Sequence, residues 1–390
     1  MSINLFFLKV YRKFFLIFFS TIYKYKKIDE NLILFSSQLD FSDNARTLYE
    51  YMISNNFSEK YKLIWIINEP DKSRTYSGFD KIEWCPIKSY NLKEIIRFSK
   101  LNMTAKYKFS THGYLMKERK NQITINLWHG AIPIKAGPKK KINKYFDFQP
   151  CPSENAFNKM NKFTGVLKEQ LILNTDCRLD CFFQKENIGI KKIISSEYDK
   201  IIICLPTFKV SSGMNDGITE EFIIPCISTY EQMEKLNILC NETNILLIIK
   251  VHHLQNVDKI KEFSFSNIFV LKDETLLENN IQLYELLSKT DALLTDFSSV
   301  AYDYLLLDRP IGFFLSQKDS YSRGFIDDDV ESEMAGKKIL NFNDLLDFVT
   351  DIKNQNDSFK SERKKIRDKY YVYQKGDNCK RLLEYLDIKK

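Results

Sequence analysis

The feature that most constrains the fold of this 390-residue chain is a series of short, almost wholly apolar runs with helical patterns between them. Strand-length runs without polar alternation are typical of strands that helices bury on both faces of a parallel sheet. The pattern restarts near residues 190–200, so the runs form two series. The expected strands are residues 31–37, 61–68, 121–128, 200–208, 244–252, 266–272, 291–296 and 310–314. Two successive βαβ series predict an α/β protein with two doubly wound domains.

The segments between these apolar runs have helical patterns, and the two series of runs divide the chain into domains. Helices are expected at residues 43–56, 281–289 and 299–309, the first with Asp43 as its N-cap. From about residue 358 to 386 the chain is charged and helix-rich, and no repeat or low-complexity linker occurs. The expected parts are an N-terminal helix (1–28), a first domain (29–185) and a second domain (186–390).

Charge and cysteine content restrict the partners and the compartment. The formal net charge is +7, a mild excess that suits anionic lipid or phosphorylated substrates. It is too small and too scattered to indicate nucleic acid. The eight cysteines form no paired framework and no zinc set, so we expect reduced thiols and a cytosolic location.

The N-terminal segment is rich in phenylalanine but is interrupted by Lys9, Arg12 and Lys13. Its longest uninterrupted apolar run, residues 14–19, is far below the roughly 20 residues that span a bilayer. No small-residue cleavage site of a secretory signal follows. The segment fits a helix on an anionic membrane surface, whose lipid-facing basic residues would be Lys24, Lys26 and Lys27. The alternative is a helix packed on the protein itself.

Polar residues follow four of the expected strands, where ligands bind in doubly wound sheets. They are His129-Gly130, Pro206-Thr207, His252-His253 and Asp296 with Ser298-Ser299. Three of the four histidines in the chain lie at such ends. The polar side chains therefore converge where a ligand would be.

The motifs leave one way of holding a diphosphate. GxxxxGK[ST] and GxGxxG are absent, so a helix N-terminus at Ser298-Ser299 is the remaining candidate, unless Ser298 only caps the helix. Lys250 and His252 share one face of a strand and suit a pyrophosphate, against the alternative of a structural imidazole. The missing GxSxG excludes a serine-hydrolase elbow, and Asp327-Asp328-Asp329 is interpreted as a solvated loop rather than a metal site.

The stretch "NLWHGAIPIKAG" contains His129, either a packed imidazole at a strand end or a general base at the sheet edge. Gly130 allows close backbone approach, Pro133 stiffens the loop, and Lys135 adds positive charge. The polar residues expected at the ends of the other strands favour the catalytic interpretation of His129.

These motifs together resemble the CDP-glycerol glycerophosphotransferase family, the polymerases and primases of wall teichoic acids and related capsule polymers. The resemblance covers most of the chain and rests on "SSQLDFSDNARTLYEYM", "NLWHGAIPIKAG", "NTDCRLD", "CLPTFK", "IIKVHH", "TDFSSVAYDYLLLDRP", "SRGF" and "KGDNCKRLLEYL". It implies a glycosyltransferase-B fold, in which two Rossmann-like domains face across a cleft that holds the nucleotide and the terminal helix crosses between them. It implies no bound metal and no cofactor.

The resemblance also implies the chemistry and the residues that perform it. An acceptor hydroxyl would attack the β-phosphorus of CDP-glycerol or CDP-ribitol, with His129 as base and CMP leaving. The residues expected to bind substrate are Trp128, Gly130, Pro133, Lys135, Arg178, Pro206, Thr207, Lys250, His252, Ser298, Ser299 and Asp303. Among them Arg178, His252 and the two serines would take the diphosphate charge.

We therefore expect an alditol-phosphate transferase that is peripheral on the cytoplasmic face of the cell membrane. Its partners would be a CDP-alditol, a lipid-linked acceptor and the anionic membrane surface, and its product a teichoic-acid-like or capsular polymer. One alternative is a nucleotide-sugar-dependent glycosyltransferase of the same fold. Another, of a different class, is a non-catalytic membrane-associated protein of polymer assembly. Glycerol and ribitol donors are not separated by these residues.

Overall fold

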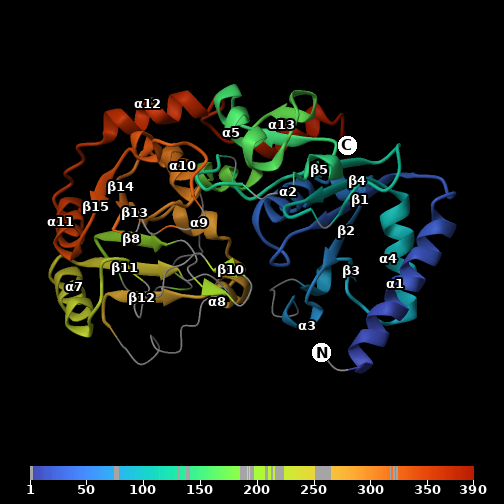
Figure 1. The fold of residues 1–390 in the computed structure, drawn as a ribbon, viewed down its shortest axis with the longest axis horizontal. Helices are drawn as coiled ribbons and strands as arrows, with labels where there is room; N and C mark the ends of the chain where they lie inside the picture. Colours follow the sequence, from blue (N-terminus) through green and yellow to red (C-terminus); the bar gives the residue numbers. More distant parts are fainter. Residues whose placement is uncertain are drawn as a thin grey trace.

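The structure is a computed structural model of the whole chain (Figure 1). The residues it describes are 3–73, 79–113, 115–130, 132–137, 141–184, 191, 193, 197–206, 210–211, 214–215, 224–250, 265–316, 318, 321 and 324–390. Thr207, His252 and His253, which the sequence places at strand ends, lie outside these residues.

The first sheet belongs to the N-terminal half, and its strand pairs are all parallel. Its strands lie in the order β3-β2-β1-β4-β5. They are β1 (Asp29–Ser36), β2 (Lys62–Ile67), β3 (Trp84–Pro86), β4 (Ala105–Ser110) and β5 (Ile123–Asn126). On one face Ile33 and Trp65 pack in a core with Leu48 of α2 (Asp43–Ser54). On the other face Leu34 packs with Phe98 of α4 (Leu92–Thr104), which explains the absence of polar alternation.

The second sheet is also parallel, with strand order β12-β11-β8-β13-β14-β15. Its strands are β8 (Lys200–Leu205), β11 (Ile245–Lys250), β12 (Ile268–Leu271), β13 (Ala292–Thr295), β14 (Ile311–Phe314) and β15 (Lys337–Ile339). In chain order this is the 3-2-1-4-5-6 arrangement of a Rossmann-like sheet, whose ligand crevice lies beyond the ends of β8 and β13. Ile202 and Ile203 point to opposite faces and belong to different core clusters.

The other elements cover these sheets or connect them. They are α3 (Pro70–Ser73), α5 (Glu154–Thr164), α7 (Tyr230–Glu242), α8 (Asp273–Glu278), α9 (Leu283–Leu287), α10 (Val300–Tyr304), α11 (Phe342–Lys353), α12 (Lys360–Tyr370), α13 (Asn378–Tyr385), β6 (Gln149–Cys151), β7 (Leu171–Leu173), β9 (Val210–Ser211) and β10 (Met214–Asn215). Short 3-10 helices are η1 (Phe57–Glu59), η2 (Phe79–Lys81), η3 (Asn143–Tyr145), η4 (Lys168–Gln170), η5 (Cys177–Phe183), η6 (Leu305–Leu307) and η7 (Val330–Glu333).

The end of the chain returns from the second half to the first. Figure 1 shows α12 along the top of the second half, with the chain after it leading to α13 beside the first half. Cys379 and Leu382 of α13 are buried in the same core as Ile33 of the first sheet. The Asp180 carboxylate accepts hydrogen bonds from the backbone N–H groups of Asn378 (2.8 Å) and Cys379 (2.9 Å). The terminal helix therefore binds the two halves together.

Helix α1 (Ile3–Tyr23) lies along α4 at the outer edge of the first half (Figure 1). Leu16 packs against the core beneath α4, and Arg12 donates a hydrogen bond to the carbonyl of Ile87. Phe14 and Phe18 are 62% and 50% exposed. Among the described residues, no helix has both the length and the apolarity to cross a membrane.

Each predicted strand is present. Most strand ends lie at or inside the predicted bounds, but β1 begins at Asp29, two residues before the predicted start at residue 31. Strand β4 was missed because lysines interrupt its apolar pattern. Lys108 is fully buried there, and its Nζ donates to Asn102 Oδ1 (2.8 Å) and to the carbonyl of Met116 (3.0 Å). Burial lowers the pKa of Lys108 to about 7. The strand thus buries a lysine by satisfying its amine with local acceptors.

Two of the helix predictions need correction. The N-cap position of α2 is Ser42, and Asp43 instead stands inside the helix start with φ of 63°. Its carboxylate does not cap the helix alone, since it also pairs with Arg178, which is distant in sequence. The helix predicted over residues 299–309 is shorter, since it consists of α10 followed by the 3-10 turn η6.

Candidate active site

The two most specific motifs of the sequence meet where the halves adjoin. Gly130 comes directly after His129, and Ser299 precedes α10 in the second half. A Cβ atom added at Gly130 would lie 2.4 Å from Ser299 Oγ and 3.1 Å from Ser299 Cβ. Only glycine lets the two segments approach this closely. The His-Gly loop and the Ser-Ser turn therefore form one site.

The chain after Gly130 continues onto the second half. Lys135 forms an antiparallel bridge with Phe325. Two backbone hydrogen bonds flank this bridge. The N–H of Ile326 donates to the carbonyl of Ile134 (2.9 Å), and the N–H of Ala136 donates to the carbonyl of Gly324 (3.0 Å). The Lys135 Nζ lies 5.8 Å from the centre of the Tyr321 ring. Pro133 is buried within this loop. The loop is thereby held by backbone hydrogen bonds to the second half.

His129 is half-buried after β5, and its ring has a defined orientation. Its Nδ1 lies 3.4 Å from the backbone carbonyl of Thr111, which can only accept a hydrogen bond. The proton of a neutral imidazole therefore belongs on Nδ1, which makes Nε2 the basic nitrogen. This is the tautomer that a general base at Nε2 requires.

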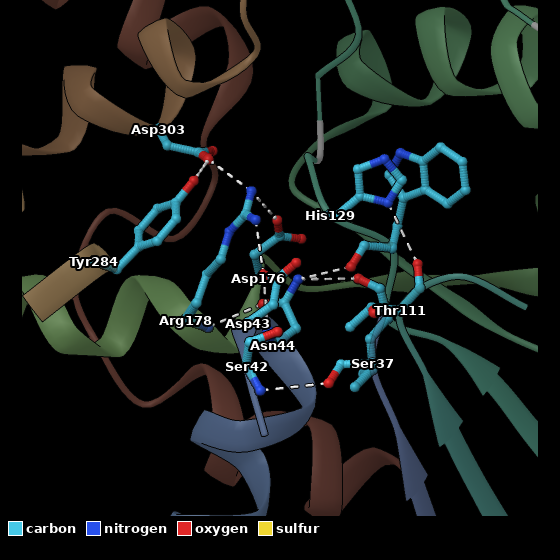
Figure 2. A network of polar contacts seen from close by, with 12 residues as sticks. Ser37, Ser42, Asp43, Asn44, Thr111, His129, Asp176, Arg178, Tyr284 and Asp303 are labelled. Atoms are coloured by element: carbon cyan, nitrogen blue, oxygen red, sulfur yellow. Dashed lines mark hydrogen bonds and ion pairs between the residues drawn. The ribbon is translucent and has the colours of Figure 1, made fainter. Parts of the chain in front are cut away.

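Asn44, at the start of α2, fixes the backbone just before His129 (Figure 2). Its side-chain amide donates to the carbonyls of Leu127 (3.2 Å) and Trp128 (3.0 Å). Its Oδ1 accepts from the backbone N–H of Arg178 (2.9 Å). Trp128 has φ of 55°, a left-handed conformation that a bulky side chain rarely adopts. The buried amide stabilises this conformation and so positions His129.

Arg178, in η5, is the centre of a buried ionic cluster that joins the two halves (Figure 2). Its Nη1 pairs with Asp43 Oδ1 (2.7 Å), and its Nη2 with Asp303 Oδ2 (2.9 Å) and Asp176 Oδ2 (3.2 Å). The guanidinium also lies 4.3 Å from the centre of the Tyr284 ring. Arg178 is 5% exposed and Asp303 is not exposed. Both residues, expected at the substrate site, thus lie in this cluster.

The cluster holds three carboxylates around one guanidinium, so the carboxylates cannot all be ionised cheaply. Burial raises the pKa of Asp176 to about 7, and the neighbouring Asp303 and Asp43 add to that rise while Arg178 opposes it. Burial likewise raises the pKa of Asp303, against the effect of Arg178. The hydroxyl of Tyr371 donates to Asp303 Oδ1 (3.2 Å), and Tyr284 donates to Oδ2.

The remaining predicted residues that the structure describes lie at or near the ends of strands in the second sheet. Pro206 directly follows β8, and Asp296 follows β13, its neighbour in the sheet. Ser299 is the N-cap residue of α10 but makes no side-chain capping hydrogen bond, so its hydroxyl does not serve as a cap. Lys250 is buried at the end of β11, where its Nζ pairs with Asp273 Oδ1 (2.8 Å).

Several residues of the site were not predicted from the sequence. His112 and Thr111 follow β4, the strand that the apolar pattern failed to indicate. Asn44 and Asp176 lie in stretches that carried the family resemblance but were given no role. Asp327, interpreted as part of a solvated loop, pairs with Lys159 Nζ (2.5 Å). In the part of the chain that the structure describes, no group of His, Cys, Asp or Glu could hold a metal ion.

Comparison with known proteins identifies the family. The family model described as CDP-glycerol:poly(glycerophosphate) glycerophosphotransferase matches residues 17–387. The chain belongs to this family. The teichoic acid poly(glycerol phosphate) polymerase of Bacillus spizizenii is 25% identical over 400 residues, with 92% of each chain covered. The teichoic acid ribitol-phosphate primase of the same organism is 23% identical over 297 residues, which cover 70% of this chain and 71% of that one.

A solved structure of the wall teichoic acid polymerase TagF, soaked with CDPG, has the same fold. The alignment covers 100% of this chain and 98% of the TagF chain, with a TM-score of 0.74 and 18% sequence identity. The expected fold is confirmed: two Rossmann-like units form a glycosyltransferase-B arrangement. As a member of the glycerophosphotransferase family, the protein is a transferase enzyme.

Proposed function

We propose that this protein transfers glycerol phosphate or ribitol phosphate from a CDP-alditol to a hydroxyl group of a lipid-linked acceptor. The product would extend a teichoic-acid-like or capsular polymer. Family membership supports the reaction class. The observation that carries the proposal for this chain is the contact of Gly130 with Ser299, because it joins a basic imidazole to hydroxyls at the nucleotide crevice.

In the proposed reaction, the acceptor oxygen attacks the β-phosphorus of the donor. The bond from that phosphorus to the bridging oxygen breaks, its electron pair stays with the bridging oxygen, and CMP leaves. His129 Nε2 takes the proton of the acceptor hydroxyl, which the Nδ1–H contact to Thr111 permits. The step thus balances without a further reactant.

The diphosphate would be held by residues at the strand ends of the second sheet. Ser299 offers a hydroxyl beside Gly130, Ser298 directly precedes it in the chain, and Pro206 begins the loop after β8. Thr207 and His252 complete the proposed set, with Lys250 supplying charge at the end of β11. Hydrogen bonds to the bridging and leaving oxygens would stabilise the charge that develops in the transition state.

Arg178 and Asp303 have a different place in this proposal. The Nη atoms of Arg178 already pair with Asp43, Asp176 and Asp303. Releasing them to bind a diphosphate would leave buried carboxylates unpaired, at a cost of several kcal/mol. We therefore assign Arg178 and Asp303 to holding the domains, residues 29–185 and 186–390, against each other.

Release of CMP by the purified protein tests the proposal. The donors to compare are CDP-glycerol, CDP-ribitol and, for a glycosyltransferase, a UDP-sugar, each with a lipid-linked acceptor. We expect CMP from a CDP-alditol and no UDP from the UDP-sugar, and His129→Gln, which keeps a polar side chain without a base, should lower turnover by at least about 10²-fold. No CMP from either alditol donor would sink the proposal. Unchanged turnover in a folded His129→Gln protein would remove the general-base role.

The N-terminal helix would bring this site to its lipid-linked acceptor. Its outer surface exposes Phe6, Phe7, Val10, Phe14, Ile17 and Phe18. Lys24, Lys26 and Lys27 are exposed just after the helix. Aromatic side chains beside a lysine cluster suit the headgroup layer of an anionic membrane. We place the protein at the cytoplasmic face of the membrane through this surface.

A further inference from the structure

His112 lies beside His129 because β4 and β5, which precede the two residues, are neighbours in the sheet. The two imidazole rings are parallel, with centroids 4.0 Å apart and an interplanar angle of 5°. Thr111 contacts both rings. Its carbonyl lies 3.4 Å from His129 Nδ1, and its hydroxyl lies 2.8 Å from His112 Nδ1.

We propose that His112 is a positioning residue, which fixes the ring plane of His129 and stabilises the imidazolium that forms during transfer. A parallel ring at 4.0 Å opposes rotation of the His129 ring, so Nε2 keeps its direction. The face of a neutral aromatic ring also attracts a cation. The His112 ring, with its centroid 4.0 Å from that of His129, and the Trp128 ring, at 4.2 Å, would each stabilise the imidazolium of His129.

This role is distinct from that of a second base. The Nδ1 of His112 pairs with Thr111 Oγ1, and the stacked arrangement aims neither nitrogen of His112 at the His129 ring. The interaction therefore acts through the ring face rather than through proton transfer. A flat, non-titrating ring at position 112 should replace most of it.

Four variants test this inference, which rests on the proposed function. His112→Ala removes the ring and should lower kcat for CMP release about tenfold, with KM for the CDP-alditol nearly unchanged. His112→Phe keeps a ring and should retain most of kcat. Thr111→Val loosens His112 and should lower kcat in part, whereas Thr111→Ser, which keeps the hydroxyl, should behave as wild type.

A measurement without turnover separates this inference from the function itself. In NMR spectra of protein labelled at its four histidines, stacking should shift the His129 ring signals upfield. The part of the shift that is due to the ring at position 112 should persist in His112→Phe and be lost in His112→Ala, where Trp128 alone remains stacked on His129.

Wild-type kcat in His112→Ala, equal losses in His112→Ala and His112→Phe, or His129 signals that do not move in His112→Ala would each overturn the inference. A wild-type protein that releases no CMP would instead remove the function on which it rests, whatever the spectra show.

Discussion

At the scale of single residues, the site depends on side chains that perform no chemistry. Asn44 donates to two consecutive carbonyls and thereby holds Trp128 at φ of 55°. A left-handed conformation of this kind costs roughly 1–2 kcal/mol in a residue with a side chain. Gly130 contributes because it has no side chain, which lets Ser299 lie directly against its backbone. Reactivity at His129 is therefore a property of its neighbours as well as of its imidazole.

The close approach at Gly130 gives a steric prediction. Gly130→Ala places a Cβ 2.4 Å from Ser299 Oγ, so the segments must move apart. We expect a melting temperature lower by a few degrees and CMP release reduced at least about tenfold. Adding Ser299→Ala removes the nearer atom and should recover part of the melting temperature.

Gly376→Ala is the matched control, because its added Cβ would meet Phe183 at an ordinary 3.4 Å. An unchanged melting temperature in Gly130→Ala would contradict the contact.

At the scale of elements, α1 differs from the other long helices in what it leaves exposed. Leu16 faces the core beneath α4, whereas the Phe14 and Phe18 rings stack on each other at the surface, with centroids 6.4 Å apart. One side of the leader therefore packs on the protein, as one of its two interpretations expects. The other side exposes the aromatic side chains on which the membrane proposal rests.

Co-sedimentation with lipid vesicles checks the membrane role of α1. The wild type should sediment with phosphatidylcholine vesicles that contain phosphatidylglycerol, and less at high salt because salt screens lysine–lipid attraction. Phe14→Ser with Phe18→Ser should leave most of the protein in the supernatant. Leu340→Ser, at a site 59% exposed on the second half, should sediment as wild type does. Full sedimentation of the double variant would refute the assignment.

At the scale of the whole molecule, buried polar contacts at the junction complement the apolar cores. The Arg178 cluster takes Asp43 and Asp176 from the first half and Asp303 from the second. Beside it, Arg46 Nη2 donates to Asn280 Oδ1 (2.6 Å), across the same junction. Such directional contacts set the relative orientation of two sheets that apolar packing alone would hold less specifically.

The cluster predicts how stability depends on pH. Burial raises the pKa of Asp176 from its ordinary 3.8 to about 7, so within this window the folded protein holds a proton that the unfolded chain has lost. Stability therefore falls as pH rises through the window, and the penalty is complete above it. Asp176→Asn removes this penalty, so its melting temperature relative to wild type should be a few degrees higher at about pH 8 than at about pH 5.

Asp368→Asn serves as the surface control for this experiment. There Lys364 lowers the pKa of the carboxyl, so no such gain toward alkaline pH is expected. A difference between Asp176→Asn and wild type that stays constant with pH would show that Asp176 does not titrate in the window.

The sequence predicted features that depend on local patterns along the chain, and it missed features that depend on particular contacts in the folded protein. The strand of Ile203 and that of Leu294 were predictable because burial on both faces imposes a local, continuous apolar pattern. Strand β4 was not, because Lys108 is buried by satisfying its amine rather than by being apolar. His112 was overlooked with it, although it stands at a strand end as His129 does.

The sequence by itself determined two parallel sheets, the edges at which their ligand-facing residues lie, and the family. Each of these follows from local patterning or from motifs read along the chain. Only the tertiary structure decided what surrounds each motif: the ring stacked on His129, the serine against Gly130, and the carboxylates around Arg178. Apart from Asp176 beside Arg178, those partners are not sequence neighbours, and tertiary packing, rather than any local propensity, brings them together.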